Sequence, residues 1–208
     1  MNPTRFFLIR HALVTPQARE VIYGNMDVAL CDAALRGEVA LHRWLATHLP
    51  RTPHWVVTPL SRTRATAAAI FAAGYPAQDL VVEPDMAEQS QGEWQGVTHE
   101  ALTERLRHPP HPFWPHAAEE RPPGGESISD VRARVGPVLD GLARRLPGTD
   151  IVMVAHGGTI RAALAHALDV DGHRALSFSV KNLSLTQLEK HGGDWRVVSV
   201  NEEPRLPA

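Results

Sequence analysis

The chain has 208 residues, 43% of them hydrophobic, which suffices for one medium-sized domain with a substantial core. A formal net charge of −2 gives no bulk attraction to nucleic acid or to an acidic membrane, and no apolar stretch approaches the ~20 residues that span a bilayer. Cys31 is the only cysteine, which excludes an internal disulfide and favours a reducing compartment. We therefore expect a cytoplasmic protein without nucleic-acid or membrane partners.

Short apolar runs alternate with stretches of helical periodicity along most of the chain. Asp32 can cap one of the helical stretches, and Ser127 or Ser129 can cap another, because Asp and Ser are residue types that cap helices. The expected elements are strands at Phe6–Ile9, His54–Val57, Leu80–Val82 and Ile151–Ala155, and helices at Ala33–Leu49, Ser61–Ala73, Thr98–Arg107, Ser127–Arg145 and Thr159–Leu168.

Three segments between these elements read as loops. Residues 13–32 and 86–96 are polar and bear glycine, and residues 108–125 hold six prolines, which excludes a regular helix there. Residues 176–200 predict two or three final strands, with His191-Gly192-Gly193-Asp194 as a hairpin turn.

The alternation of strands and helices predicts a three-layer α/β/α architecture with a mostly parallel central sheet. No internal repeat and no linker divides the chain, so we expect one domain over residues 1–208. The Pro-rich segment, residues 108–125, would then be an excursion over the active-site face. His108, His111 and His116 fall in this segment, and their spacing fits no regular zinc pattern. We expect them to line or shield the entrance through which a substrate would pass.

Two predicted strands end in a histidine. Arg10-His11 follows the first, and His156-Gly157-Gly158 follows the fourth, directly before a helix. Open α/β sheets bind ligands at the carboxyl ends of their strands. Glycines allow a ligand to approach the backbone, and a helix N-terminus offers amide donors to an anion. This pattern indicates a site for an anionic group between the two strand ends.

The sequence resembles the histidine phosphatase superfamily, also called phosphoglycerate-mutase-like, from Leu8 to about Leu185 and in the family's order. Each motif alone is weak, and their order carries the resemblance. The matching motifs are Leu8-Ile9-Arg10-His11, the loop positions Gly24, Asp27 and Leu30, Gly37, Thr58-Pro59-Leu60-Ser61-Arg62-Thr63-Arg64-Ala65-Thr66-Ala67, Glu88 with Gly92-Glu93-Trp94-Gln95-Gly96, Gly124-Gly125-Glu126-Ser127, and Val154-Ala155-His156-Gly157-Gly158.

The resemblance implies hydrolysis of a small phosphate monoester without a metal or a cofactor. His11 would be the nucleophile that forms a phosphohistidine, and Glu88 the general acid that protonates the leaving oxygen. The fork of an arginine guanidinium suits phosphate because it bonds two oxygens at once. The residues expected to hold the phosphate are Arg10, Arg62, His156, Gln17 and Gly157.

The chain departs from the family next to the nucleophile. Ala12-Leu13-Val14 follows His11 where the family usually has Gly-Glu-Thr, and Gln17 stands near a position that is usually asparagine. The insertion with paired arginines that phosphoglycerate mutases use is absent. A phosphoglycerate mutase, a specialised phosphatase such as an α-ribazole phosphatase, and a non-catalytic phosphate-binding domain remain alternatives. Residues 13–25 and 97–123 are expected to recognise the organic part of the substrate.

Overall fold

A computed structural model describes residues 2–204. Its centre is a six-stranded sheet with the order β3-β2-β4-β1-β5-β6, which places the first and the fourth strand of the chain side by side. The strands are β1 (Thr4–Arg10), β2 (His54–Val57), β3 (Leu80–Val82), β4 (Asp150–Ala155), β5 (Leu185–His191) and β6 (Asp194–Glu202).

The sheet is parallel from β3 to β1 and antiparallel at its other edge. β4 pairs in parallel with both β1 and β2, whereas β5 pairs antiparallel with β1 and β6. The prediction of a mostly parallel sheet is therefore confirmed. The hairpin turn between β5 and β6 also lies where it was predicted, with His191 opposite Asp194.

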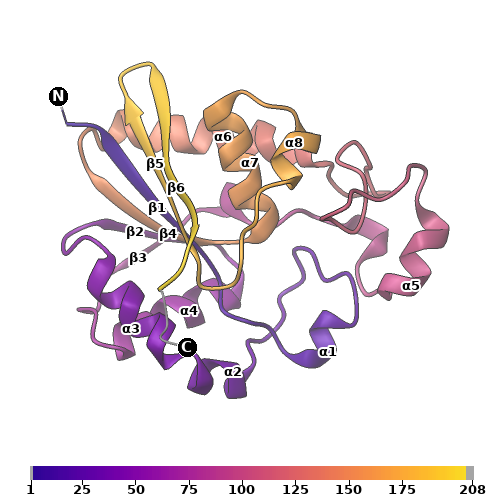
Figure 1. The fold of residues 1–208 in the computed structure, drawn as a ribbon, viewed down its shortest axis with the longest axis horizontal. Coiled ribbons are helices and arrows are strands. Elements are labelled where there is room, and N and C mark those ends of the chain that lie inside the picture. The colour runs from indigo at the N-terminus through magenta and orange to yellow at the C-terminus, as the bar shows by residue number, and fades with distance from the viewer. Residues whose placement is uncertain (1, 205–208) are drawn as a thin grey trace.

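Helices cover both faces of the sheet, because side chains alternate along the buried strands. In β1, Phe6 and Leu8 pack with α6 (Ile128–Arg145) and α7 (Gly157–Leu168). Phe7 and Ile9 point to the opposite face and pack with α3 (Val39–His48) and α4 (Ser61–Ala72). Figure 1 shows these helix pairs above and below the sheet, which confirms the three-layer α/β/α architecture.

Two predicted helices are shorter than expected. The stretch Ala33–Leu49 forms α2 (Asp32–Gly37) and then α3, with a break at Glu38, and Asp32 is the first residue of α2 rather than its cap. Gly37 lowers helix propensity at this break. Thr98–Arg107 forms only α5 (His99–Leu102) and a 3₁₀ turn, because no long apolar face stabilises a longer helix there.

The remaining helices are α1 (Pro16–Arg19) and α8 (Gly172–Leu176). Residues 176–184 precede β5 and contain no strand, so the described residues from 176 to 204 hold two strands, the lower of the two predicted numbers. Of the two residues predicted to cap α6, Ser127 and Ser129, the structure has Ser127, which forms a capping box with Asp130.

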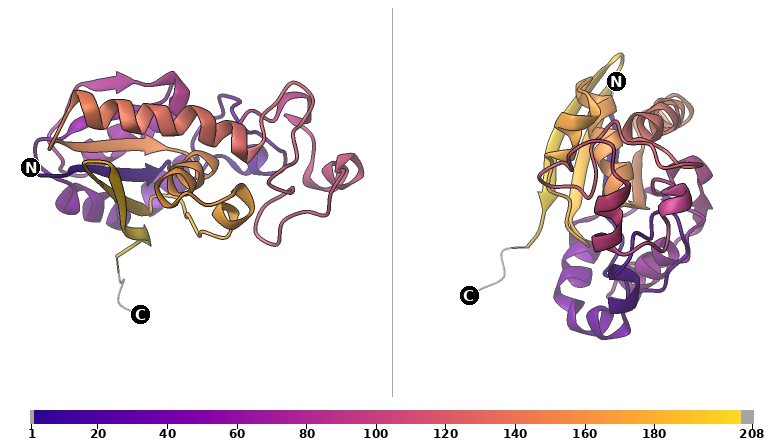
Figure 2. Two further views of the ribbon diagram at one scale, coloured as in Figure 1. Left: turned by 90° about the horizontal axis from the view of Figure 1, so that it is seen from above. Right: turned by 90° about the vertical axis from the view of Figure 1, so that its right-hand side faces the viewer.

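The Pro-rich segment contains no regular helix, as predicted. Together with α5 it extends from the end of the sheet that is farthest from the N-terminus (Figure 2). This is the end at which β1 and β4 have their carboxyl termini. Across residues 2–204, no helix is long and apolar enough to cross a membrane.

Candidate active site

The two strand-end histidines lie next to each other. Arg10 pairs with Ala155 in the parallel register of β1 and β4, so His11 and His156 leave neighbouring strands at the same level. Their ring centroids are 5.3 Å apart, and both side chains are buried. The sheet thus brings together two residues that are far apart in the sequence, as the sequence predicted.

His11 is held in one tautomer by its own backbone. Its Nδ1 lies 2.7 Å from the carbonyl oxygen of Ala12, and a carbonyl can only accept, so Nδ1 carries the proton. Nε2 is then left with its lone pair. Burial lowers the pKa of His11 well below 6.5, and the charges of Arg62 and Arg10 lower it further. The ring is therefore neutral at physiological pH, as a nucleophile must be.

His156 makes hydrogen bonds through both ring nitrogens. Arg62 donates from Nε to Nδ1 of His156 at 3.3 Å, and Nε2 lies 3.0 Å from the hydroxyl of Thr58. Because Nδ1 accepts, Nε2 carries the proton and donates to Thr58. Burial first, and then Arg62, lower the pKa of His156 well below 6.5. In this state its N–H is directed at Thr58 rather than at a ligand.

Arg62 is fully buried near the start of α4. Besides His156, its guanidinium donates to the carbonyl oxygens of Gly24 and Met26, at 2.8 and 2.6 Å. The ring of Tyr23 lies 5.4 Å from its Cζ atom. Arg62 therefore holds residues 23–26 against the site. The two carbonyl oxygens accept from the Nη1 and Nη2 groups of Arg62, which are the donors that a phosphate would use.

Arg10 has a donor that is not engaged. Its Nη1 donates to the carbonyl of Val180 at 2.6 Å, while its buried Nε has no hydrogen-bond partner among the described residues. A second guanidinium lies nearby, since a Cβ placed on Gly157 would be 3.4 Å from Arg10 Cζ and 3.2 Å from Arg161 Nη1. Burial lowers the pKa of Arg161 to about 10, which leaves it cationic at neutral pH. Positive charge is thus concentrated on one side of the site.

Glu88 lies on the N-terminus of α7. Its carboxylate accepts from the backbone N–H groups of Gly158 at 3.1 Å, Thr159 at 3.2 Å and its own neighbour Gln89 at 3.0 Å. A Cβ on Gly158 would lie only 2.5 Å from Glu88 Oε1, so this glycine permits the contact. The sequence predicted that the amide donors at this helix end would bind an anionic ligand, whereas in the structure the carboxyl group of Glu88 accepts from them.

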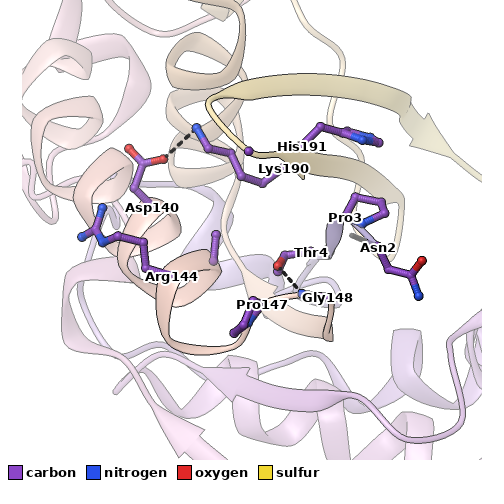
Figure 3. Close-up of a pocket in the computed structure, with 11 residues that line it drawn as sticks. Asn2, Pro3, Thr4, Asp140, Arg144, Pro147, Gly148, Lys190 and His191 are labelled. Atoms are coloured by element: carbon purple, nitrogen blue, oxygen red, sulfur yellow. Dashed lines mark hydrogen bonds and ion pairs between the residues drawn. The ribbon is translucent and has the colours of Figure 1, made fainter.

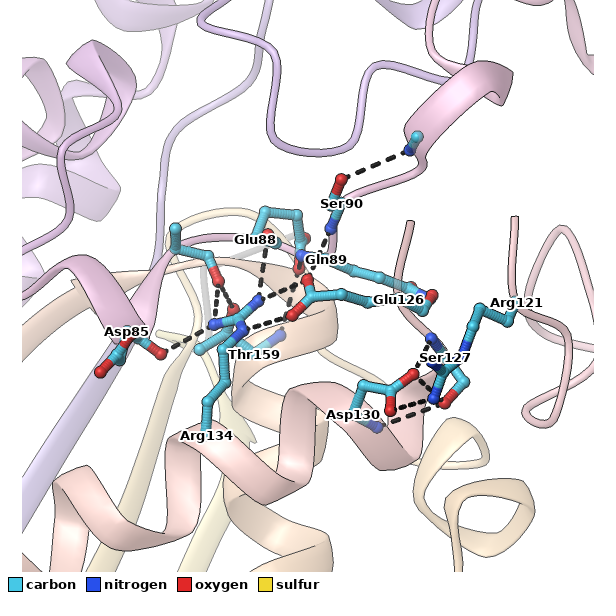
Figure 4. A network of polar contacts seen from close by, with 12 residues as sticks. Asp85, Glu88, Gln89, Ser90, Arg121, Glu126, Ser127, Asp130, Arg134 and Thr159 are labelled. Atoms are coloured by element: carbon cyan, nitrogen blue, oxygen red, sulfur yellow. Dashed lines mark hydrogen bonds and ion pairs between the residues drawn. The ribbon is translucent and has the colours of Figure 1, made fainter. Parts of the chain in front are cut away.

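An ion pair between Arg134 and Glu126 holds the loop that carries Glu88. Arg134 on α6 donates to the Glu126 carboxylate from Nε at 2.7 Å, and to the backbone carbonyls of Asp85, Ala87 and Glu88 at 2.7 to 3.2 Å. Glu126 in turn accepts from the backbone N–H of Ser90 at 2.8 Å. Figure 4 shows this clamp, by which the loop is tied to α6 on both sides of Glu88.

Two of the predicted phosphate ligands, Gly157 and Gln17, lie in different parts of the structure. Gly157 begins α7 beside Arg10 and Arg161, close to the centre of the site. Gln17 is exposed on α1 and is not among the described residues that line the cavity beside Arg10. A phosphate-binding role for Gln17 stays a prediction from the sequence, and the arrangement of α1 gives it no support.

A cavity of about 220 Å³ opens beside Arg10 and Glu88. A larger one, of about 670 Å³, lies at the opposite end of the sheet. Thr4, Asp140, Arg144 and Lys190 are among the residues that line the larger cavity, which Figure 3 shows. Its central charges neutralise each other, since Lys190 lies 3.2 Å from Asp140. The smaller cavity is the candidate substrate site, because two predicted site residues, Arg10 and Glu88, line it.

Several residues of this site were not singled out from the sequence. Thr58 and Arg161 lie in or beside quoted motifs, but nothing in their types indicated a role. Glu126 belongs to the Gly-Glu-Ser element, whereas its partner Arg134 has no motif at all. Asn182 donates to the backbone carbonyl of His11 at 2.8 Å, a contact that only the fold reveals.

The chain matches the histidine phosphatase superfamily (branch 1) over residues 6–203, and it belongs to that family. The resemblance stated from the motifs is thereby confirmed.

Among particular relatives, the chain is 31% identical to a glucosyl-3-phosphoglycerate phosphatase of Mycolicibacterium vanbaalenii, over 92% of this chain and 86% of the relative. It is 32% identical to a bifunctional protein of Mycobacterium tuberculosis over 81% of this chain, but it covers only 45% of that longer protein. The solved structure of a mycobacterial glucosyl-3-phosphoglycerate phosphatase superposes with a TM-score of 0.81 at 26% identity, covering 96% of this chain and 99% of the other.

Proposed function

We propose that this chain is a metal-independent phosphomonoesterase that works through a phosphohistidine on His11. The observation that carries the proposal is the neutral His11 ring, whose Nδ1–H is fixed on Ala12 and whose Nε2 lies among arginines. A neutral imidazole nitrogen with a fixed tautomer is a competent nucleophile, and neighbouring guanidinium groups stabilise charge on the transferring phosphoryl oxygens.

In the first step, the Nε2 lone pair of His11 attacks phosphorus and the bond from phosphorus to the ester oxygen breaks. Protonated Glu88 gives its proton to that oxygen, so the product leaves as an alcohol. In the second step, water attacks the phosphohistidine and gives a proton to Glu88, while the N–P bond breaks. Inorganic phosphate is released, and both His11 and Glu88 return to their starting states.

Arg10, Arg62 and His156 bind the phosphoryl group in this scheme. Arg10 offers its unused Nε, whereas Arg62 exchanges the carbonyl oxygens of Gly24 and Met26 for phosphate oxygens. His156 gives up its hydrogen bond to Thr58 in the same way. The exchange replaces neutral carbonyl acceptors by anionic phosphate oxygens, so the attraction between opposite charges is added to hydrogen bonds that Arg62 already makes.

We propose that residues 1–208 act as one catalytic domain, because the first and the last strands of the chain share one sheet. We also propose a cytoplasmic protein whose partner is a small phosphorylated molecule, without nucleic acid or membrane. The phosphoglycerate mutase alternative gains no support from the cavity, since no arginine besides Arg10 is among its described lining residues.

The test is hydrolysis of p-nitrophenyl phosphate in the presence of EDTA. We expect turnover that EDTA does not reduce and that His11→Ala abolishes. Rapid quenching with a labelled phosphate ester is expected to trap an acid-labile phosphoprotein in the wild type and not in the variant. Turnover that disappears with EDTA, or label that survives in His11→Ala, contradicts the proposal.

A further inference from the structure

The turn that precedes β5 contacts both Arg10 and His11 at the end of β1. The Val180 carbonyl accepts from Nη1 of Arg10 at 2.6 Å, and the backbone N–H of Leu183 donates to the Arg10 carbonyl at 2.9 Å. Between them, Asn182 donates from Nδ2 to the carbonyl oxygen of His11 at 2.8 Å. One turn, which lies outside the family motifs of the sequence, thus holds the arginine side chain and the backbone of the histidine together.

The backbone of this turn is strained at Leu183. Its φ is 59°, in the left-handed region that side chains other than glycine rarely adopt. The other non-glycine residues with a positive φ among residues 2–204 are Asp169 and Asn201, whose types tolerate this conformation. Leu183 is fully buried in the same apolar cluster as Ala12, which offsets the cost of its backbone. Such strain is typical of segments that position functional groups.

The peptide group between His11 and Ala12 is held from both sides. Asn182 donates to its carbonyl oxygen, and its N–H donates to the hydroxyl of Thr66 on α4 at 2.9 Å. Because a peptide group is planar, these two contacts fix its orientation and the direction in which the chain continues. The next carbonyl, that of Ala12, is the group that accepts from Nδ1 of His11 at 2.7 Å. The hydrogen bond that sets the tautomer of His11 therefore depends on how this peptide group is held.

We propose that Asn182 is a positioning residue, which holds the imidazole of His11 in the tautomer whose Nε2 attacks phosphorus. The inference rests on the proposed phosphomonoesterase function and adds a residue to it. Asn182 is not among the described residues that line the cavity beside Arg10, so it acts on His11 through the backbone and not on a ligand. Its amide donates without carrying a charge. A neutral replacement of similar size therefore removes the hydrogen bond and leaves the charges of the site in place.

The kinetic test is Asn182→Leu, which keeps the approximate size of the side chain and removes the donor. We expect kcat for p-nitrophenyl phosphate to fall by about tenfold, because a smaller fraction of His11 then has a free Nε2. The inhibition constant of inorganic phosphate should stay within about twofold, since Arg10 and Arg62 still bind it. Asn182→Gln keeps an amide donor and should recover part of kcat. An unchanged kcat in Asn182→Leu, or an equal loss of phosphate affinity, overturns the inference.

NMR of protein labelled with ¹⁵N-histidine measures the tautomer directly. In the wild type, the signals of His11 should be those of a ring with a protonated Nδ1 and an unprotonated Nε2, and His11→Asn identifies them by their absence. In Asn182→Leu these signals should move toward those of the other tautomer, a change that a loss of stability does not produce. A lower kcat with an unchanged tautomer overturns the inference.

A matched control makes the same substitution at the other end of β1. Asn2 lines the larger cavity, and Asn2→Leu should alter neither kcat nor the histidine signals. If Asn2→Leu lowers kcat as much as Asn182→Leu does, the loss does not depend on the contact with His11, and the inference is wrong.

The activity of the wild type separates the two proposals. If the wild type does not hydrolyse p-nitrophenyl phosphate, the phosphomonoesterase function fails, and the role of Asn182 fails with it. If the wild type is active while Asn182→Leu keeps its kcat and its tautomer, only the role of Asn182 is wrong.

Discussion

Two cavities lie at opposite ends of one sheet, and they differ in how their charges are arranged. At the amino end of β1, the larger cavity contains the pair of Lys190 and Asp140, which neutralise each other. At the carboxyl end, Arg10 lies beside the smaller cavity, and Arg62 and Arg161 are buried close by. Here like charges are gathered, and the side chains of Glu88 and Asp27 lie near them.

The proposed site is the smaller of the two cavities, so it was assigned from its charged residues and not from its size. The carboxyl ends of parallel strands place consecutive loops around one point, so residues from distant parts of the chain meet there. At the amino end of β1 the charged groups are paired with each other, as Arg5 is with Asp150 and Lys190 with Asp140. The predictions that follow compare the two ends.

The largest effect is expected from His11→Asn. The variant removes the nucleophile and should lower kcat for p-nitrophenyl phosphate by about 10⁴-fold or more. His191→Asn makes the same change at the other end of the sheet, where His191 lines the larger cavity, and should leave kcat within about twofold. Similar losses in the two variants would mean that the active site has been assigned to the wrong end of the sheet.

Glu88→Gln should have an effect that depends on the leaving group. Loss of a general acid costs about 10²- to 10⁴-fold when the leaving alkoxide needs a proton. We therefore expect a loss of that order for glycerol 3-phosphate and a much smaller loss for p-nitrophenyl phosphate, whose phenolate leaves unprotonated. Steady-state kcat for both esters provides the measurement, and a uniform loss would assign Glu88 a role in binding only.

Arg134→Leu should reproduce this pattern in weaker form, because Arg134 holds the backbone on which Glu88 depends. We expect about a tenfold loss of kcat for the alkyl ester, a smaller loss for the aryl ester, and partial recovery in Arg134→Lys. Arg132→Leu on the same helix is the control, since Arg132 pairs with Asp169 away from the loop. If both variants lose activity equally, Arg134 stabilises the fold as a whole and has no specific role in positioning Glu88.

The pKa of His11 sets a further expectation. Because the folded pKa is lowered, the ring stays neutral as the pH falls below about 6.5, and its NMR signals should not titrate between about pH 7 and pH 6. In the unfolded chain, by contrast, His11 binds a proton as the pH falls through about 6.5. The free energy of unfolding should therefore fall as the pH drops below about 6.5. His11→Asn should reduce that slope in denaturant titrations at several pH values, and an unchanged slope would contradict a neutral His11.

The smallest effect is expected at the larger cavity. Lys190→Met breaks the partly exposed pair with Asp140 and should lower the free energy of unfolding by about 1 kcal/mol or less. We expect kcat and KM to remain those of the wild type. Urea unfolding together with steady-state kinetics checks both statements, and a change in KM would make the larger cavity part of the substrate site.

The sequence was most informative where chemistry and the strand pattern coincide. The strand ends at Arg10-His11 and at His156 could be located because apolar runs stop at functional residues. The break at Glu38 and the short α5 were missed, since local periodicity does not reveal which faces find a partner.

Contacts between segments that are distant in the sequence could not be predicted either. Arg134 contacts the Glu88 loop only because α6 packs beside it, and no motif marks this arginine. Asn182 contacts His11 only because the turn before β5 returns to the end of β1. Both side chains donate to backbone carbonyl groups, whose positions no residue type reveals.

The register between β1 and β4 also has a consequence for folding. Arg10 lies opposite Ala155, and a slip by one residue would turn every side chain of a strand to the other face and separate His11 from His156. The two strands are far apart in the sequence, so their pairing has a high contact order and is expected to form slowly. Recovery of activity during refolding should therefore lag behind the return of helical signal, and it would report the moment at which the centre of the sheet closes.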